Sequence, residues 1–233
     1  MSAGGEAFVA ALGRPDPAGP PGLSFPNPVD QETWDYLYPE VGAGYYLNRF
    51  LYLFGANLSS LEPCLQAWSF LLPTDGARVI LGRNAYGALL ILENANLSGT
   101  KSRVYVLDPI GVVYRRNPQA ALENLFGYWL PNKALPNFFN SGIYDTWVAG
   151  SGRYLADDEI LGIKVPLGLG GSLALDNFQP EPIVRYYQTT GPIYAKAFAQ
   201  MAASAGRPPA DEDTGKKTEK PGRGKRGGKR GKT

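Results

Sequence analysis

The chain has 233 residues, 44% hydrophobic and 19% charged, which is enough to bury a substantial core. It contains no histidine, which removes the commonest general base and metal ligand and excludes Ser-His and Cys-His catalytic pairs. The single cysteine, Cys64, excludes an internal disulfide framework and is typical of a reducing compartment.

The net charge of +2 is unevenly distributed. Residues 206–233 carry ten Lys and Arg against four Asp and Glu, and residues 1–205 carry thirteen against seventeen. We therefore expect a mildly acidic folded body and a disordered basic tail over residues 205–233. No apolar run approaches the roughly 20 residues that span a bilayer, and the N-terminus lacks the basic region of a signal peptide. A cytoplasmic protein is expected.

Residues 1–28 are rich in glycine and proline. These residues do not sustain the interior of a helix or sheet, so the pattern predicts a flexible leader. The alternative is a short docking helix that contains Phe8 and Val9.

Residues 29–75 form the predicted N-terminal half. A helix is expected to begin after the N-cap Asp30 and to end before Pro39, because Trp34, Leu37 and Tyr38 fall on one apolar face. The run Phe50–Phe54 predicts a strand, and Ser59–Leu72 predicts a second helix with a proline in its first turn.

The stretch 77–116 contains three apolar runs, Val79–Leu81, Leu89–Leu92 and Val104–Leu107. Turn residues bound each run, which is typical of consecutive strands. Because the runs are continuously apolar, both sheet faces are expected to be covered by helices. The sequence predicts an α+β fold with a mostly antiparallel central meander over about residues 78–116.

Residues 76–204 form the predicted C-terminal α+β domain. Asn117-Pro118 is expected to start an amphipathic helix that Pro131 stops, and a helical rhythm continues over residues 138–148. The run Val184–Tyr187 predicts one more strand, and Gly191-Pro192 is expected to open the last helix.

Four segments carry a family resemblance: residues 34–54, 81–92, 104–113 and 152–171. In this order they resemble a bacterial two-part family with a GAD-like N-terminal half and a C-terminal half of formerly unknown function. The family is known chiefly for immunity proteins that neutralise DNase toxins delivered by type VI secretion. The resemblance implies a non-enzymatic protein that binds and occludes a cognate nuclease-type toxin. Ala88 stands where the family usually has an acidic residue, and the basic tail is an addition.

The candidates for the toxin interface are aromatic, amide or charged residues. Tyrosine and arginine in particular are enriched among the residues that dominate binding energy at protein interfaces. The candidates are Tyr45, Tyr46, Arg49, Arg83, Asn84, Tyr86 and Asp108. The alternative for the tyrosines is ordinary half-buried packing, and for Asp108 it is an Asx-turn that accepts backbone N–H groups.

Two further patterns have plain structural interpretations. Gly87, Gly168, Gly170 and Gly171 are interpreted as structural turns, since no Lys-Ser/Thr follows as a phosphate loop requires. The acids 157–159 are interpreted as first-turn residues of a helix rather than metal ligands.

We expect no catalytic residues, cofactor or metal. A carboxylate enzyme that uses Asp108 or Glu93 is a minor alternative. Acid–base catalysis needs two groups with separated pKa values, and the sequence indicates no such pair. A second alternative is a nucleic-acid-associated or regulatory domain that binds through its basic tail. Its candidate residues are Arg223, Lys225, Arg226, Lys229 and Arg230.

Overall fold

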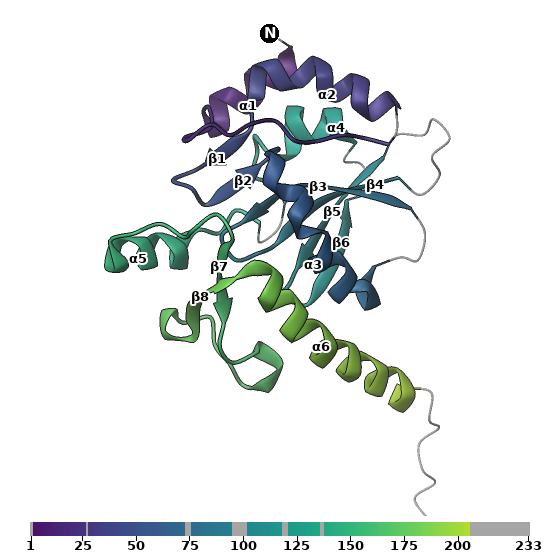
Figure 1. Ribbon diagram of the computed structural model, residues 1–233, viewed down its shortest axis with the longest axis vertical. Helices are drawn as coiled ribbons and strands as arrows, with labels where there is room; N and C mark the ends of the chain where they lie inside the picture. Colours follow the sequence, from purple (N-terminus) through teal and green to yellow (C-terminus); the bar gives the residue numbers. More distant parts are fainter. Residues whose placement is uncertain are drawn as a thin grey trace, which may run out of the picture.

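The computed structural model describes residues 2–26, 28–72, 76–94, 102–117, 121–135 and 138–205. The tail candidates Arg223, Lys225, Arg226, Lys229 and Arg230 lie outside the described residues. Within these ranges the chain forms a six-stranded antiparallel sheet, a separate two-stranded hairpin and six α-helices (Figure 1). The predicted α+β fold with a central meander is confirmed.

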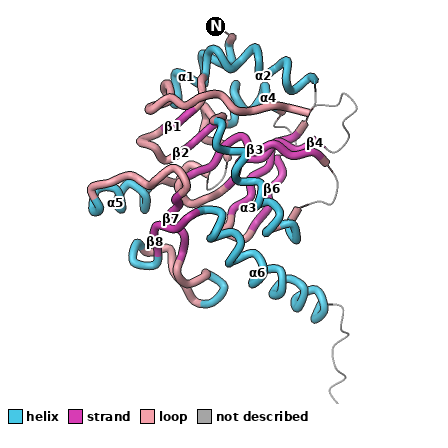
Figure 2. The backbone as a smooth tube through the Cα atoms, viewed as in Figure 1, coloured by secondary structure: helices cyan, strands magenta, loops and turns pink. Residues whose placement is uncertain are grey.

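The large sheet follows the chain order without a crossover. Figure 2 shows the strands in magenta. The strands of the large sheet are β1 (Gly44–Tyr46), β2 (Leu51–Leu53), β3 (Ala77–Asn84), β4 (Leu89–Asn94), β5 (Arg103–Asp108) and β6 (Val113–Asn117). The three predicted apolar runs lie in β3, β4 and β5. Strand β1 was not predicted, because it has only three residues and begins at a glycine.

The first two strands belong to the same sheet as the other four. Strand β2 pairs with β3 through Leu51–Asn84, Tyr52–Arg83 and Leu53–Gly82. The buried side chains likewise form one cluster that extends from Phe8 to Tyr187. The predicted division near residue 75 therefore falls between neighbouring strands of one sheet.

Helices cover both faces of this sheet. Strand pairing places Tyr45, Tyr52 and Arg83 on one face and Tyr46 on the other, since side chains alternate along a strand. Phe8 of α1 (Ala3–Leu12) contacts Tyr46 on the second face, beside α2 (Pro28–Val41) and α4 (Leu122–Asn124). On the first face, α3 (Glu62–Ala67) lies against α6 (Ile183–Ala205), whose far end extends away from the body (Figure 1).

The N-terminal segment differs from the predicted flexible leader. Ser2 accepts a hydrogen bond from the Gly5 amide at 3.0 Å and caps α1, and Phe8 is fully buried. After the helix, the Asp16 amide donates to the Tyr45 carbonyl at 2.6 Å, so the proline-rich stretch runs along the edge of β1. Burial of Phe8 and Leu12 outweighs the poor intrinsic helix propensity of the glycines. The alternative, a docking helix, describes this segment.

Two further differences from the predicted helices occur in segments that contain a proline. Helix α2 continues through Pro39 to Val41, where the Tyr46 hydroxyl donates to the Val41 carbonyl at 2.8 Å and holds the last turn. The predicted helix Ser59–Leu72 is divided into a 3-10 turn (Ala56–Leu61), α3 and a second 3-10 turn (Ser69–Leu71). Pro63 lies in the first turn of α3, as expected.

The C-terminal part contains α5 (Gly142–Ser151), β7 (Glu159–Ile163) and β8 (Phe178–Pro182) before α6. The helix predicted after residue 117 is present as α4 and a π-helical turn, Leu125–Trp129. The prediction of a strand at Val184–Tyr187 is wrong, because these residues form the first turns of α6.

Tertiary burial decides the start of α6. The indole of Trp68 donates to the Tyr187 carbonyl at 3.1 Å, and the Tyr187 hydroxyl donates to the Gly87 carbonyl at 2.8 Å. Helix α6 then passes through Pro192, which is exposed, so water can satisfy the carbonyl that proline leaves free. None of the described helices has the length and apolar character needed to cross a membrane.

Candidate functional site

Three of the seven interface candidates come together around the turn that precedes β7. Tyr45 pairs with Tyr52, and Tyr52 pairs with Arg83, so these side chains form a row across three strands. The rings of Tyr45 and Tyr52 are 4.8 Å apart. Arg49 lies in the loop between β1 and β2, at one end of this row.

The loop that carries Arg49 has an unusual backbone. Leu47, Asn48 and Arg49 have φ angles of 51°, 54° and 63°, which is the left-handed region. A left-handed turn costs roughly 1–2 kcal/mol per non-glycine residue and normally involves single residues. Three in succession persist only where surrounding contacts hold them, and such strain is concentrated at functional sites.

Tyrosines from the C-terminal part hold this loop. The Tyr144 hydroxyl donates to the Asn48 carbonyl at 3.0 Å, and the Tyr154 hydroxyl donates to Asn48 Oδ1 at 2.7 Å. The turn is therefore fixed by residues about 100 positions further along the chain.

The guanidinium of Arg49 is placed between two aromatic rings. Its Cζ lies 4.4 Å from the ring centre of Tyr45 and 5.3 Å from that of Tyr154. An arginine nitrogen of Arg49 donates to Asp157 Oδ1 at 3.3 Å, whereas its Nε is buried without a hydrogen-bond partner among the described residues. Contacts of this kind hold the guanidinium in one orientation.

Asp157 forms hydrogen bonds with all three candidates, Tyr45, Arg49 and Arg83. Its Oδ1 accepts from the Tyr45 hydroxyl at 2.7 Å, and its backbone carbonyl accepts from Arg83 at 2.7 Å. Burial raises the pKa of Tyr45, which keeps the hydroxyl a proton donor. Acids 157–159 do not begin a helix as predicted, because Asp157 and Asp158 lie in a turn and Glu159 is the first residue of β7. The Asp157 side chain is 65% exposed, so one carboxylate edge faces solvent.

A hollow of about 400 Å³ opens beside Arg49. Arg14 of the N-terminal segment and Tyr154, which is 42% exposed, contribute to its lining. We name this surface the Arg49 face. It comprises Arg14, Tyr45, Asn48, Arg49, Tyr154 and Asp157. Arg14, Asn48, Tyr154 and Asp157 were missed by sequence reasoning, because nothing local marks them as neighbours of Arg49.

The other candidates lie elsewhere. Tyr46 is interior, and its hydroxyl donates to the Val41 and Gly42 carbonyls at 2.8 and 3.1 Å. Oδ1 of Asn84 accepts from the Tyr86 and Ala88 amides, both at 3.0 Å, and so shapes the β3–β4 turn. These contacts are internal to the fold.

Asp108 forms the Asx-turn that was its alternative interpretation. Its Oδ1 accepts from the Ile110 and Gly111 amides at 3.0 Å. Asn84, Tyr86 and Asp108 also line a different hollow, of about 210 Å³. Tyr45 and Arg49 therefore belong to the Arg49 face, and Asn84, Tyr86 and Asp108 line the second hollow. Tyr46 is interior, and Arg83 lines a third cavity.

The two carboxylates of the minor enzyme alternative are far apart. Glu93 pairs with Arg103 on β5, whereas Asp108 ends the same strand five residues later, about 16 Å away at the usual strand rise. Glu93 accepts from Arg78 at 2.8 Å and from the Tyr114 hydroxyl at 2.9 Å. Glu93 and Asp108 therefore do not form a matched acid–base pair.

Three of the four predicted turn glycines meet a structural requirement. Gly87 has a φ of +82°, and an added Cβ would lie 2.8 Å from Ile160; Gly170 has a φ of +88°. A Cβ on Gly171 would lie 1.8 Å from the Val165 carbonyl oxygen. Gly168 has open space around it and no left-handed φ, so the structure shows no such need there.

Across the part of the chain that the structure describes, no three acidic or cysteine side chains gather closely enough to hold a metal ion.

Comparison with known proteins identifies a similar fold. No protein-family model matches this chain. No curated protein matches it either. The crystal structure of Atu4351 from Agrobacterium tumefaciens superposes with a TM-score of 0.55 at 16% identity and covers 82% of this chain and 88% of that one. At this identity the likeness concerns the fold alone.

Proposed function

We propose that this protein is an immunity protein that binds and occludes a cognate nuclease-type toxin, of the type VI secretion class, in the cytoplasm. The Arg49 face is the proposed contact surface. The family resemblance of the sequence motivates the choice of toxin. The preorganised Arg49 side chain is the observation that carries the proposal.

Preorganisation matters because immobilising a long side chain on binding costs roughly 0.5–1.5 kcal/mol. Arg49 is already held between Tyr45 and Tyr154, so little of that cost remains. Arginine and tyrosine are also the residue types that dominate binding energy at protein interfaces. Such a face suits a stoichiometric inhibitor.

Charge supports a nuclease as the partner. Residues 1–205 carry four more acidic than basic side chains, and a surface that grips phosphate is basic. Opposite net charges accelerate association and disfavour wrong partners. This effect comes from residues 1–205 as a whole, because the Arg49 face itself carries Arg14 and Arg49 against Asp157. The exposed carboxylate edge of Asp157 offers a direct contact for a basic side chain of the toxin.

Co-expression with the product of the adjacent gene tests the proposal. We expect protection by the wild-type protein. Arg49→Ala and Tyr154→Ala should each weaken toxin affinity by about thirtyfold, corresponding to a hot-spot loss of about 2 kcal/mol.

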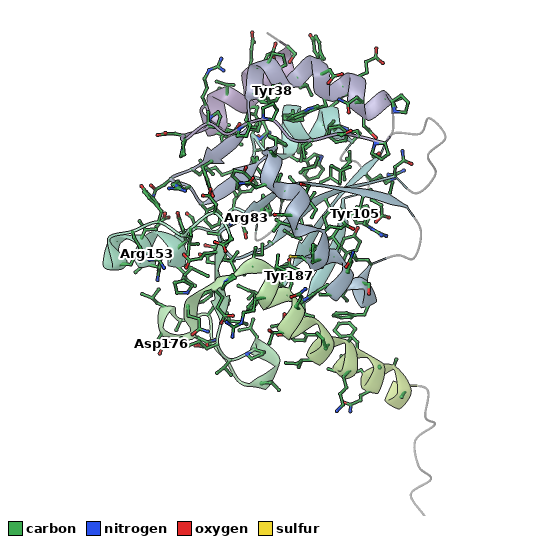
Figure 3. The ribbon with its side chains drawn as sticks, viewed as in Figure 1. Tyr38, Arg83, Tyr105, Arg153, Asp176 and Tyr187 are labelled. Carbon is green, nitrogen blue, oxygen red and sulfur yellow. The ribbon has the colours of Figure 1, made fainter. Side chains whose placement is uncertain are left out.

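Arg153→Ala is the matched control. Arg153, which Figure 3 labels, is exposed and also contacts an aromatic ring, Trp147 at 5.2 Å. It is not one of the residues that make up the Arg49 face. Its removal should leave affinity unchanged. An adjacent product that is harmless, or toxicity that persists in the presence of this protein, would disprove the toxin-binding function. An unchanged toxin affinity of Arg49→Ala would exclude this face.

The second candidate function is nucleic-acid association through the tail. Residues 216–233 carry nine Lys and Arg against one Glu, a composition that binds polyanions with steep salt dependence. Deletion of residues 206–233 should abolish retention on DNA or RNA at low salt. Unchanged retention after the deletion would remove this candidate.

A further inference from the structure

Arg83 is a buried positive charge without a direct carboxylate partner. Its side chain is on β3, and the residue is only 4% exposed. Within the described residues its guanidinium makes one hydrogen bond, to the Asp157 carbonyl at 2.7 Å, and no carboxylate lies at ion-pair distance. Burial lowers the pKa of Arg83, yet an arginine stays protonated in proteins.

The two nearest acids do not neutralise it directly. Oδ1 of Asp157 is taken by Tyr45 and Arg49, and only its backbone carbonyl reaches Arg83. Asp158 is exposed, and its carbonyl accepts from the Ile183 amide at 2.8 Å. An unpaired buried charge is costly, and a bound anion would offset that cost.

A cavity of about 190 Å³ opens onto Arg83. Most of its lining is apolar and comes from Leu58, Leu61, Ile183 and Val184. The polar residues Tyr52, Ser60, Asp157 and Asp158 also line it. The exposed residue Asn57 lies at its rim. The first turn of α6 forms part of the wall, and the positive end of that helix dipole favours an anion.

Size and lining limit the ligand. Pockets for drug-sized molecules have volumes of about 300–1,000 Å³, so a nucleotide does not fit here. The apolar walls favour a short hydrocarbon stem over a bare phosphate, which needs more donors than one guanidinium. Arginine binds a carboxylate through two parallel hydrogen bonds.

We propose that this cavity, the Arg83 pocket, binds a carboxylate carried on a short apolar stem. The carboxylate is supplied either by a small organic acid or by an aspartate or glutamate side chain of a partner protein. The pocket shares Asp157 with the Arg49 face but does not include Arg49 or Tyr154, so different variants test the two proposals.

Titration calorimetry on the full chain tests the proposal with three probes. These are sodium butyrate, the neutral isostere butyramide, and a capped tripeptide with one glutamate between two alanines. We expect saturable binding of butyrate or of the peptide and none of butyramide. Tighter binding of butyrate would identify a small organic acid as the ligand, and tighter binding of the peptide would identify an acidic side chain of a partner protein.

Two variants locate the binding. Arg83→Gln should weaken it by at least about tenfold, the loss expected for a charge-assisted hydrogen bond. Val184→Trp leaves Arg83 in place and should block the cavity, which keeps the test decisive if the first variant fails to fold. Arg185→Gln removes an exposed arginine of the same helix outside the pocket and should bind as wild type. Equal binding of butyrate and butyramide, binding of neither carboxylate, or full binding by Val184→Trp would overturn the proposal.

Discussion

Replacing Phe8 with alanine tests whether the N-terminal segment is part of the folded protein. The ring is fully buried and contacts the rings of Tyr46, Phe54 and Phe126 at centroid distances of 5.5, 6.2 and 5.6 Å. Removing it loses the transfer free energy of a buried phenylalanine and leaves a cavity. For Phe→Ala substitutions in cores this amounts to about 3–5 kcal/mol.

The free energy of unfolding of Phe8→Ala should therefore fall by that amount in a urea titration. The thermal midpoint should fall by roughly 6–20 °C for a chain of this size. Glu6→Ala changes an exposed residue of the same helix and should cost less than about 0.5 kcal/mol. A loss below about 1 kcal/mol for Phe8→Ala, with amides of residues 8–12 that exchange as fast as in an unfolded peptide, would refute the docking of α1 and restore the flexible leader.

Three further predictions concern the turn, the ion pair and the thiol. Gly87→Ala should lower stability by about 1–3 kcal/mol in chemical denaturation, because φ is +82° and the new Cβ would lie 2.8 Å from Ile160; Gly150→Ala, with open space around it, should not destabilise, and equal effects would contradict the strain argument. The hydrogen bond from Arg153 lowers the pKa of Glu159 in the folded protein. Its stabilisation is therefore complete above the unfolded value of about 4.3 and is lost as pH falls through the folded value. The stability difference between wild type and Glu159→Gln should shrink over that window, and a difference independent of pH would exclude the linkage. Burial raises the pKa of the Cys64 thiol to about 12, so a disulfide reagent at about pH 8 should label it only after denaturation; rapid labelling of the native protein would show that the site opens.

Some features of the fold follow from local sequence alone. The continuous apolar runs in β3, β4 and β5 carry their own strand signal, because each run is short and is bounded by turn residues. Gly87 is equally local, since a tight turn with positive φ disfavours any side chain. These features were predictable without knowledge of distant contacts.

Other features depend on partners far away in the chain. Val184–Tyr187 has strand-like local propensity, yet burial of Tyr187 against Trp68 makes it helical. The residues 3–12 look like a leader until Phe8 finds its aromatic neighbours. Local propensity is a weak prior, and tertiary burial overrides it in both cases.

The sequence by itself determined the fold class, the meander, the uneven charge and the lack of histidine chemistry, because each of these depends on composition or short-range pattern. Only the tertiary structure decided which candidates meet. Asp157 reaches Tyr45 across 112 residues, Arg49 across 108 and Arg83 across 74. No local pattern encodes such separations, because they result from the way the turn before β7 packs on one face of β1, β2 and β3.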